Sequence, residues 1–378
     1  MRIGINGQRM LMEQPAGPEV YTINLVKGLA QTDKVNEYVI YFPSEPSPEF
    51  WISLIGNNER FKFKVIKKKI SWTQISLAYE LIRHPPDIFF TSVHTMPVIR
   101  RFSLKTIGMI HGLEYPFSKA YRNLIQRMLL GKPEQYVVKF SKAVIVPSNH
   151  VKEAILAKNW TGDDKKVRVI PEGVSSDFHK YSDEEINAMK VKYHVDKDYL
   201  IFISTIQPRK NLPKLVEAFA LALKEIGETD IKLAVVGKLG WDYEESLASP
   251  KNFGVEKEVL FLGRVDDKDL PVLLSGSMGY VSVSFDEGFG LPLLEAMASG
   301  VPAIVSDIRA YRELAGEFVW YADPFNVEDI KDKLIRLIKG GYPLESISRA
   351  GEVAKKYNWV RAAAKTVKAL IEAYEGTE

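Results

Sequence analysis

Cysteine is absent from this sequence of 378 residues. Its absence excludes disulfides, thiolate nucleophiles and zinc or iron–sulfur sites built on sulfur, and it favours a reducing compartment. Charge of one sign is also scarce, because 51 Lys and Arg residues against 48 Asp and Glu residues leave a net charge of +3. Duplex binding needs a larger basic excess, so we expect no nucleic-acid partner.

Long hydrophobic runs are missing as well. No stretch approaches the roughly 20 apolar residues of a membrane helix, and Asn6 and Gly7 break the apolar start of the chain, so we expect no secretory leader and a cytoplasmic protein. The basic run 62–69 (KFKVIKKK), with Arg100 and Arg101, could still contact the anionic inner membrane face peripherally. The alternative for this run is a solvated charged face.

What the sequence does contain is a regular alternation of short apolar runs with segments of helical period. This alternation predicts an α/β fold with parallel sheets and helical crossovers. The expected strands of the first half are Arg2–Asn6, Tyr38–Phe42, Phe61–Ile66, Ile88–Thr91, Lys105–Met109, Ala143–Val146 and Val167–Ile170. Those of the second half are Leu200–Ser204, Lys232–Val236, Val259–Leu262, Gly279–Val283, Ala303–Val305 and Phe318–Tyr321.

A break in this pattern marks the domain boundary. Pro171 to Val174 and the polar stretch that follows are typical of a linker. We predict two doubly wound, Rossmann-like domains, 1–171 and 172–358, with a C-terminal helix over 359–378 that packs back on the first domain. Two such domains facing each other leave a cleft at the carboxyl ends of their strands, and helix N-termini there suit a nucleotide.

The strongest motif, EGFGLPLLEA, covers 287–296 and joins a predicted strand to a predicted helix. Its glycines, including Gly290, allow close approach of a ligand to the backbone, and Pro292 suits a first helical turn, whose N–H groups attract an anion. Glu287 and Glu295 can each accept two hydroxyl hydrogen bonds from a sugar or ribose diol. The alternative is a capped helix with solvated glutamates.

A second strand-to-helix turn, STIQPRKNL over 204–212, carries two adjacent cations, Arg209 and Lys210. Cations at a helix N-terminus oppose the macrodipole, so their presence is unfavourable unless an anion binds there. A bidentate guanidinium and an ammonium could together stabilise a departing diphosphate. A solvated basic turn is the alternative.

Two further candidates lie in the first half. Gly17 follows the first predicted strand, at the place of a phosphate loop, but the spacing is not G-x-G-x-x-G, and an ordinary loop is equally consistent with it. His111 follows a later strand at the sheet edge where ligands bind, whereas the other histidines have no such placing. A lone histidine is more often a surface or hydrogen-bonded core residue.

Acidic pairs for a divalent metal are present only in unsuitable places. Asp196 and Asp198 precede a strand, and Asp267 and Asp269 lie where a helix N-cap and first turn favour Asp. We therefore expect no metal site.

Five segments together resemble the retaining glycosyltransferases of family 4, and within them the mannosyltransferase-B-like group. They are VIVPSNH (144–150), TIQPRKNL (205–212), VVGKLGW (235–241), LGRVDDKDLPVLL (262–274) and EGFGLPLLEAMASGVPAIVSD (287–307). The resemblance spans nearly the whole chain. It implies the GT-B fold, an N-terminal acceptor domain and a C-terminal domain that binds a nucleotide sugar, with no cofactor besides that donor.

The resemblance also implies site residues. The catalytic group would be Glu287, Arg209, Lys210 and His111. The donor-binding group would be Gly17, Arg264, Val265, Phe289, Gly290, Leu291 and Glu295. The sequence departs from the family pattern at Gly112, where the family often has Asp, and at Glu172, where it often has Asn.

Retaining enzymes of this kind are thought to react on one face of the sugar, so no carboxylate nucleophile and no separate base are expected. The expected activity is transfer of a hexose, with mannose from GDP-mannose favoured, to a saccharide or lipid-linked acceptor. A nonenzymatic regulator that binds sugar nucleotides, or a phosphorylase or epimerase on the same fold, are the alternatives.

Overall fold

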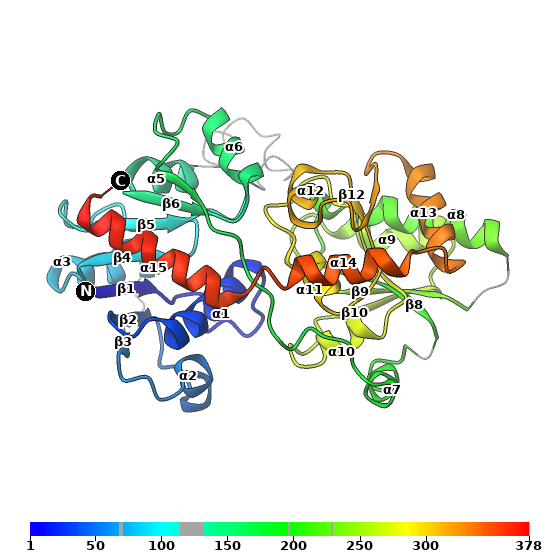
Figure 1. Ribbon diagram of the computed structural model, residues 1–378, viewed down its shortest axis with the longest axis horizontal. Coiled ribbons are helices and arrows are strands. Elements are labelled where there is room, and N and C mark those ends of the chain that lie inside the picture. The colour runs from blue at the N-terminus through cyan, green and yellow to red at the C-terminus, as the bar shows by residue number, and fades with distance from the viewer. Residues whose placement is uncertain (68–70, 114–131, 196, 228–229, 378) are drawn as a thin grey trace. The chain divides into compact units, whose positions relative to one another are not determined.

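The chain divides into two compact units, each built on one parallel sheet (Figure 1). The computed structural model describes residues 1–377 except 68–70, 114–131, 196 and 228–229. The first unit contains the described residues of 1–173 together with 357–377, and the second contains those of 174–356. The chain therefore passes from one unit to the other near residue 173 and returns near residue 357.

The first unit has a seven-stranded sheet in the order β3-β2-β1-β4-β5-β6-β7. The strands are β1 (Arg2–Asn6), β2 (Glu37–Phe42), β3 (Phe61–Val65), β4 (Ile88–Thr91), β5 (Lys105–Met109), β6 (Ala143–Val146) and β7 (Val167–Val169). The helical segments are α1 (Gly17–Thr32), α2 (Pro48–Ile55), the π-helical η1 (Trp72–Leu77), α3 (Ala78–Arg83), α5 (Lys132–Phe140), α6 (Asn149–Ala157) and α15 (Trp359–Glu375).

The second unit repeats the theme with a six-stranded sheet in the order β10-β9-β8-β11-β12-β13. The strands are β8 (Tyr199–Ile203), β9 (Lys232–Val236), β10 (Val259–Gly263), β11 (Gly279–Ser282), β12 (Ala303–Ser306) and β13 (Trp320–Ala322). The helical segments are α7 (Asp183–Lys192), η4 (Pro208–Lys210), α8 (Leu212–Ile226), α9 (Glu244–Phe253), α10 (Leu270–Ser275), α11 (Leu291–Ala298), α12 (Arg309–Ala315), α13 (Val327–Ile338) and α14 (Leu344–Ala354).

The predicted α/β class and all the predicted strands are confirmed. The last strand was predicted from Phe318, but it begins at Trp320. The reason is local, because the Phe318 N–H donates to Ala315 O at 3.3 Å and closes a turn after α12. The central strands read as continuous apolar runs because helices cover both faces of a parallel sheet.

The C-terminal helix α15 packs against α1 in the first unit, and Figure 1 shows the two helices side by side. Leu370 on this helix is fully buried, whereas Val367 and Ile371 are half-buried. The buried face consists mostly of alanines with Thr366. Small side chains let the axes of α1 and α15 approach closely. The packed face therefore consists of small residues, and a search for large hydrophobic side chains does not identify it.

In the second unit, α8 illustrates how the sequence forms the core. The fully buried residues include Leu212, Leu215, Val216 and Phe219, the last three of which lie three, four and seven positions after the first. This spacing places them on one helix face, which packs on the sheet with α13. The helix thereby fixes the position of the turn that precedes it.

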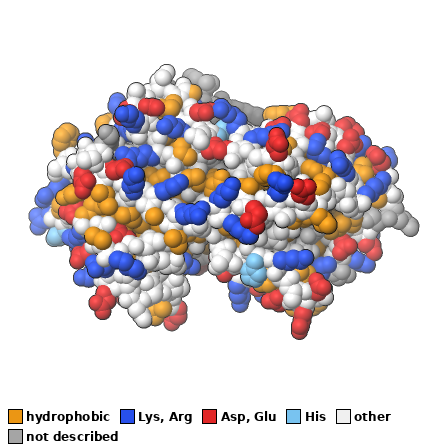
Figure 2. All heavy atoms as spheres, viewed as in Figure 1, with side chains coloured by type: hydrophobic (Ala, Val, Ile, Leu, Met, Phe, Trp, Pro, Cys, Tyr) orange, Lys and Arg blue, Asp and Glu red, His pale blue; other side chains and the backbone are white. Residues whose placement is uncertain are grey.

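Within the described part of the chain, no helix is both long and apolar enough to cross a membrane. On the face shown in Figure 2, acidic and basic side chains are interspersed.

Candidate functional site

The candidate site of the second unit lies where its sheet changes winding direction. Strand order runs outward from β8 through β9 to β10 and from β11 through β12 to β13, so the change falls between β8 and β11. Arg209 and Lys210 follow β8, and Glu287 follows β11. Segments that leave neighbouring strands at such a point form the usual ligand crevice of an open α/β sheet.

The structure brings these three charged side chains into direct contact. Glu287 Oε2 lies 2.9 Å from Arg209 Nη1, and Glu287 Oε1 lies 2.7 Å from Lys210 Nζ. Arg209 and Glu287 are buried, with exposed fractions of 3% and 8%. Two cations share one carboxylate, so the cluster carries a net positive charge in a desolvated setting and can attract an anion.

The electrostatics of Glu287 follow from these contacts. Burial alone would raise the pKa of its carboxyl group, but the charges of Lys210 and Arg209 outweigh burial and lower that pKa to about 2. Tyr311 on α12 lies behind the carboxylate, with its hydroxyl 3.4 Å from Glu287 Oε1. Burial and the charge of Glu287 raise the pKa of Tyr311 well above 10.0, so this phenol is a neutral hydrogen-bond donor.

Asn211 holds the cation turn in place. It adopts a left-handed conformation with φ of 57° between η4 and α8, a conformation that asparagine tolerates better than most residues. Its buried side-chain amide donates to Val283 O at 2.9 Å and to Pro324 O at 2.8 Å. The amide thus ties the turn after β8 to the end of β11.

The turn before α11 is shaped by Gly290. This residue has φ of 106°, and a Cβ atom there would lie 2.6 Å from the Tyr311 ring. Only glycine fits this position without strain. The turn leads into α11 through Leu291, while Phe289 is buried and Glu295 is half-buried on the helix. The helix N-terminus therefore lies next in sequence to the Glu287 cluster, and the main-chain N–H groups of a helix N-terminus attract an anion.

The remaining second-unit candidates lie beyond β10. Arg264 Nη2 contacts Asp267 Oδ1 at 2.7 Å, and Val265 is buried. Asp269 is the N-cap of α10 and contacts Lys192 Nζ at 2.5 Å. Arg264 and Val265 follow the edge strand β10, and no described contact joins them to the Glu287 cluster.

Among the residues that the structure describes, no group of three His, Asp or Glu side chains could hold a metal ion. Asp196, in the other acidic pair, lies outside the described residues.

Gly17 and His111 belong to the first unit. Gly17 opens α1, with space around it for a side chain. His111 follows β5, and its ring is in edge contact with the ring of Tyr21 on α1, with centroids 4.8 Å apart. The imidazole Nε2 lies 2.9 Å from Ser92 O, and Nδ1 lies 3.3 Å from Glu172 Oε1. The carboxyl ends of β4, β5 and β7 thus meet at this histidine.

Sequence reasoning overlooked a second histidine, His94. The expectation that only His111 follows a strand in this way is wrong. His94 comes shortly after β4, and its ring centroid lies 5.6 Å from that of His111. Burial, and then the charges of His111 and Arg9, lower the pKa of His94 to about 3. The short distance from the end of β4 was the available sequence signal. The sequence carries no such signal for Tyr311 and Glu172, because each contacts a residue that is far away in the sequence.

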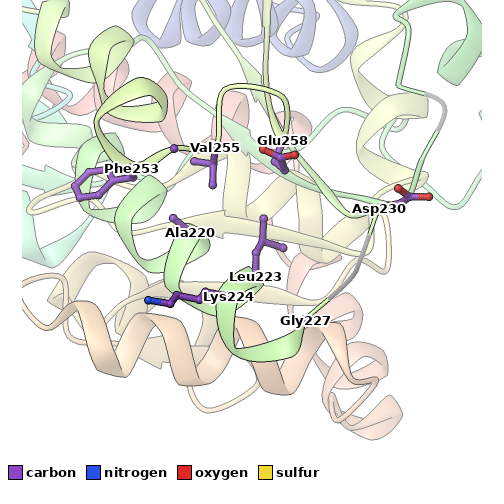
Figure 3. A pocket seen from close by; sticks show the side chains of 9 residues that line it. Ala220, Leu223, Lys224, Gly227, Asp230, Phe253, Val255 and Glu258 are labelled. Atoms are coloured by element: carbon purple, nitrogen blue, oxygen red, sulfur yellow. The ribbon is translucent and has the colours of Figure 1, made fainter.

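A separate hollow lies at the opposite end of the strands of the second sheet, where the strands begin (Figure 3). Its lining includes Leu223 and Lys224 near the end of α8, with Asp230 and Glu258 just before β9 and β10. These residues precede the strands, whereas the Glu287 cluster follows them. The hollow is therefore distinct from the candidate site.

Comparison with known proteins gives two family matches that together cover most of the chain. The model described as Glycosyltransferase Family 4 matches residues 15–178, and the model described as Glycosyl transferases group 1 matches residues 183–357.

Curated relatives and a solved structure add to this. O-antigen chain mannosyltransferase B of Escherichia coli is 32% identical over 197 residues, which are 52% of this chain and 51% of that protein. O-antigen chain mannosyltransferase RfbU of Salmonella typhimurium is 29% identical over 65% of this chain and 66% of that protein. This chain thus matches about half to two thirds of their length. Anabaena Alr3699/HepE in complex with UDP-glucose shares the fold, with a TM-score of 0.78 at 17% identity over 98% of this chain and 100% of that chain.

Proposed function

The chain belongs to the group 1 and family 4 glycosyltransferases with the GT-B fold, and on that premise we propose that it transfers a hexose from a nucleoside diphosphate sugar. The favoured donor is GDP-mannose, in keeping with the mannosyltransferase relatives, and the acceptor is a saccharide or a lipid-linked saccharide. The anomeric configuration is retained, and no metal ion takes part.

The observation that carries the proposal is the buried contact of Arg209 and Lys210 with Glu287. Departure of a nucleoside diphosphate builds negative charge on the β-phosphate, and fixed cations stabilise that charge. Two cations held by one carboxylate retain net positive charge. This charge can replace a magnesium ion in stabilising the departing diphosphate. The main-chain N–H groups before and within the first turn of α11 supply further donors.

The other donor contacts follow from the family resemblance. Glu295 would bind the ribose diol, and Glu287 would also contact the donor sugar. The backbone of Phe289, Gly290 and Leu291 would meet sugar hydroxyls and phosphate. Arg264 and Val265 would line the base pocket, while Gly17 and His111 would contribute from the first unit.

The transfer step needs no protein nucleophile. The bond from the anomeric carbon to the phosphate oxygen breaks, and the acceptor oxygen bonds to the same face of that carbon. The acceptor proton passes to the departing phosphate oxygen, which acts as the base. This scheme differs from that of retaining hydrolases, in which a second carboxylate forms a covalent intermediate.

Peripheral contact with the inner face of a membrane is the second part of the proposal. The segment between β4 and β5 exposes Val98, Ile99 and Phe102, with exposed fractions of 56%, 70% and 107%. Arg100 and Arg101 lie within the same segment. Apolar side chains beside cations suit an anionic bilayer surface. The run 62–69 lies on and after the edge strand β3, and its Lys68 and Lys69 lie outside the described residues.

A transfer assay tests the proposal. The protein is incubated with GDP-mannose, a mannobiose acceptor bearing a chromophore and an excess of EDTA, and the product is examined by NMR. We expect an α-linked product, because the donor is itself the α-anomer, and the same rate with and without EDTA. A β-linked product, or loss of turnover in EDTA, contradicts the proposal.

The same assay separates the alternatives. Donor isomerisation without an acceptor indicates an epimerase, and sugar phosphate formed with inorganic phosphate indicates a phosphorylase. Donor binding without any product across a panel of nucleotide sugars and acceptors indicates a regulator.

A further inference from the structure

Both ring nitrogens of His111 face oxygen atoms of the protein. Nε2 lies 2.9 Å from the main-chain carbonyl oxygen of Ser92, and Nδ1 lies 3.3 Å from Oε1 of Glu172. The side chains of His111 and Glu172 are largely buried, with exposed fractions of 13% and 6%. Water therefore has little access to relieve an unfavourable contact here.

The chemistry of these oxygens fixes the number of protons that the contacts need. A carbonyl oxygen only accepts hydrogen bonds, and so does an ionised carboxylate. A neutral imidazole has one N–H group, so one of its two nitrogens would then direct a lone pair at an oxygen. Both contacts become favourable only when the pair holds two protons, with the second one between Nδ1 and Glu172.

We propose that Glu172 holds His111 as an imidazolium, with a proton on each ring nitrogen, and that Glu172 is a positioning residue for this cation. The Coulomb attraction between an imidazolium and a carboxylate 3.3 Å apart opposes the cost of burying the two charges. Glu172 is one of the two positions at which the sequence departs from the family pattern.

The other titratable groups around the ring do not compete for this role. Tyr21, from α1, stays neutral because burial and the charge of Glu172 raise its pKa. His94, from the segment after β4, stays neutral because its pKa is lowered to about 3, mainly by burial. Arg9, which also acts on His94, is itself paired with Glu19 at 2.5 Å. Among the described residues, Glu172 is thus the only acidic side chain in contact with the ring.

The position of Glu172 is fixed by the backbone beside it. A Cβ atom on Gly173 would lie 2.3 Å from Trp359 N, so the chain passes directly against the start of α15. The Trp359 ring in turn contacts Tyr21, with centroids 5.7 Å apart. The carboxylate therefore belongs to a packed cluster at the place where the chain leaves and re-enters the first unit, and its aim at His111 is built into that packing.

The consequence for chemistry rests on the proposed function. An imidazolium has no lone pair, so His111 does not take the acceptor proton and instead provides a fixed positive charge.

The direct test is the protonation of His111 in the full chain. In protein labelled with ¹⁵N-histidine, ring nitrogens are observed through the carbon-bound ring protons, so exchange of the N–H protons does not hide them. His111 is assigned by its loss in His111→Gln. We expect both His111 nitrogens to be protonated at neutral pH in the wild type and only one in Glu172→Gln.

The matched control is Glu49→Gln, which removes an exposed carboxylate from α2 of the same unit and should leave the His111 signals unchanged. A wild-type His111 with a single proton overturns the proposal, and this result does not depend on the folding of Glu172→Gln. Two protons on His111 in Glu172→Gln overturn it as well. The spectrum does not depend on activity, so a failure of the proposed transfer reaction is seen separately.

Discussion

At the scale of single residues, Glu287 has a structural task as well as its proposed role toward the donor. Its carboxylate is the shared partner of two cations at the candidate site, one of them fully desolvated. Removing one member of a buried ion pair leaves charge uncompensated, which costs about 3–5 kcal/mol of stability. The site therefore depends on this residue even before a ligand binds.

This leads to a prediction on pH dependence. The pKa of Glu287 is lowered from 4.5 to about 2, so the stability from its ionised form is fully present above pH 4.5 and is lost as pH falls toward about 2. Glu287→Gln lacks this titration. We expect the variant to be less stable at neutral pH, and the gap from the wild type to narrow between pH 4.5 and 2 in urea unfolding experiments.

The control is Glu256→Gln, which changes an exposed carboxylate in the same unit. It should follow the wild type over the whole pH range. A constant gap between Glu287→Gln and the wild type down to pH 2 would show that the carboxylate is not held ionised by its neighbours.

At the scale of elements, the strands were predictable and many side-chain contacts were not. Each strand of the parallel sheets is a short apolar run between turns, so periodicity located it. Arg209, Lys210 and Glu287 were named as candidates because each follows a predicted strand. Tyr311 was not, since its contact depends on how α12 packs behind the turn at Gly290.

The segment between β4 and β5 supports a prediction at the same scale. If Ile99 and Phe102 insert into an anionic bilayer, replacing both with Ser removes part of the about 1.5–3 kcal/mol that each buried side chain contributes. We expect binding to phosphatidylglycerol vesicles, measured by cosedimentation, to become at least about tenfold weaker. The control Leu344→Ser changes a side chain that is 81% exposed in the second unit. Equal binding by the double variant and this control would contradict the proposed contact.

At the scale of the whole molecule, the sequence indicated two α/β units because the predicted strand pattern begins again at Leu200. It placed the boundary between 171 and 172, and the units of the structure divide after Gly173. The long-range contact of His111 with Glu172 was out of reach of the sequence, because the two are 61 positions apart. Such contacts depend on strand order, which periodicity does not give.

The central claim is that the cations at Arg209 and Lys210 bind the diphosphate of a nucleotide sugar. The most direct test measures the thermal stability of the whole chain with GDP-mannose and with a panel of other nucleotide sugars. The free sugars serve as the comparison. A donor at about 100 times its dissociation constant adds about 2.7 kcal/mol to the free energy of unfolding. We predict that this stabilisation appears in the wild type and in Lys180→Ala, an exposed control, and is largely lost in Lys210→Ala. Equal stabilisation of Lys210→Ala and the wild type, or none in the wild type with any nucleotide sugar, would contradict the claim.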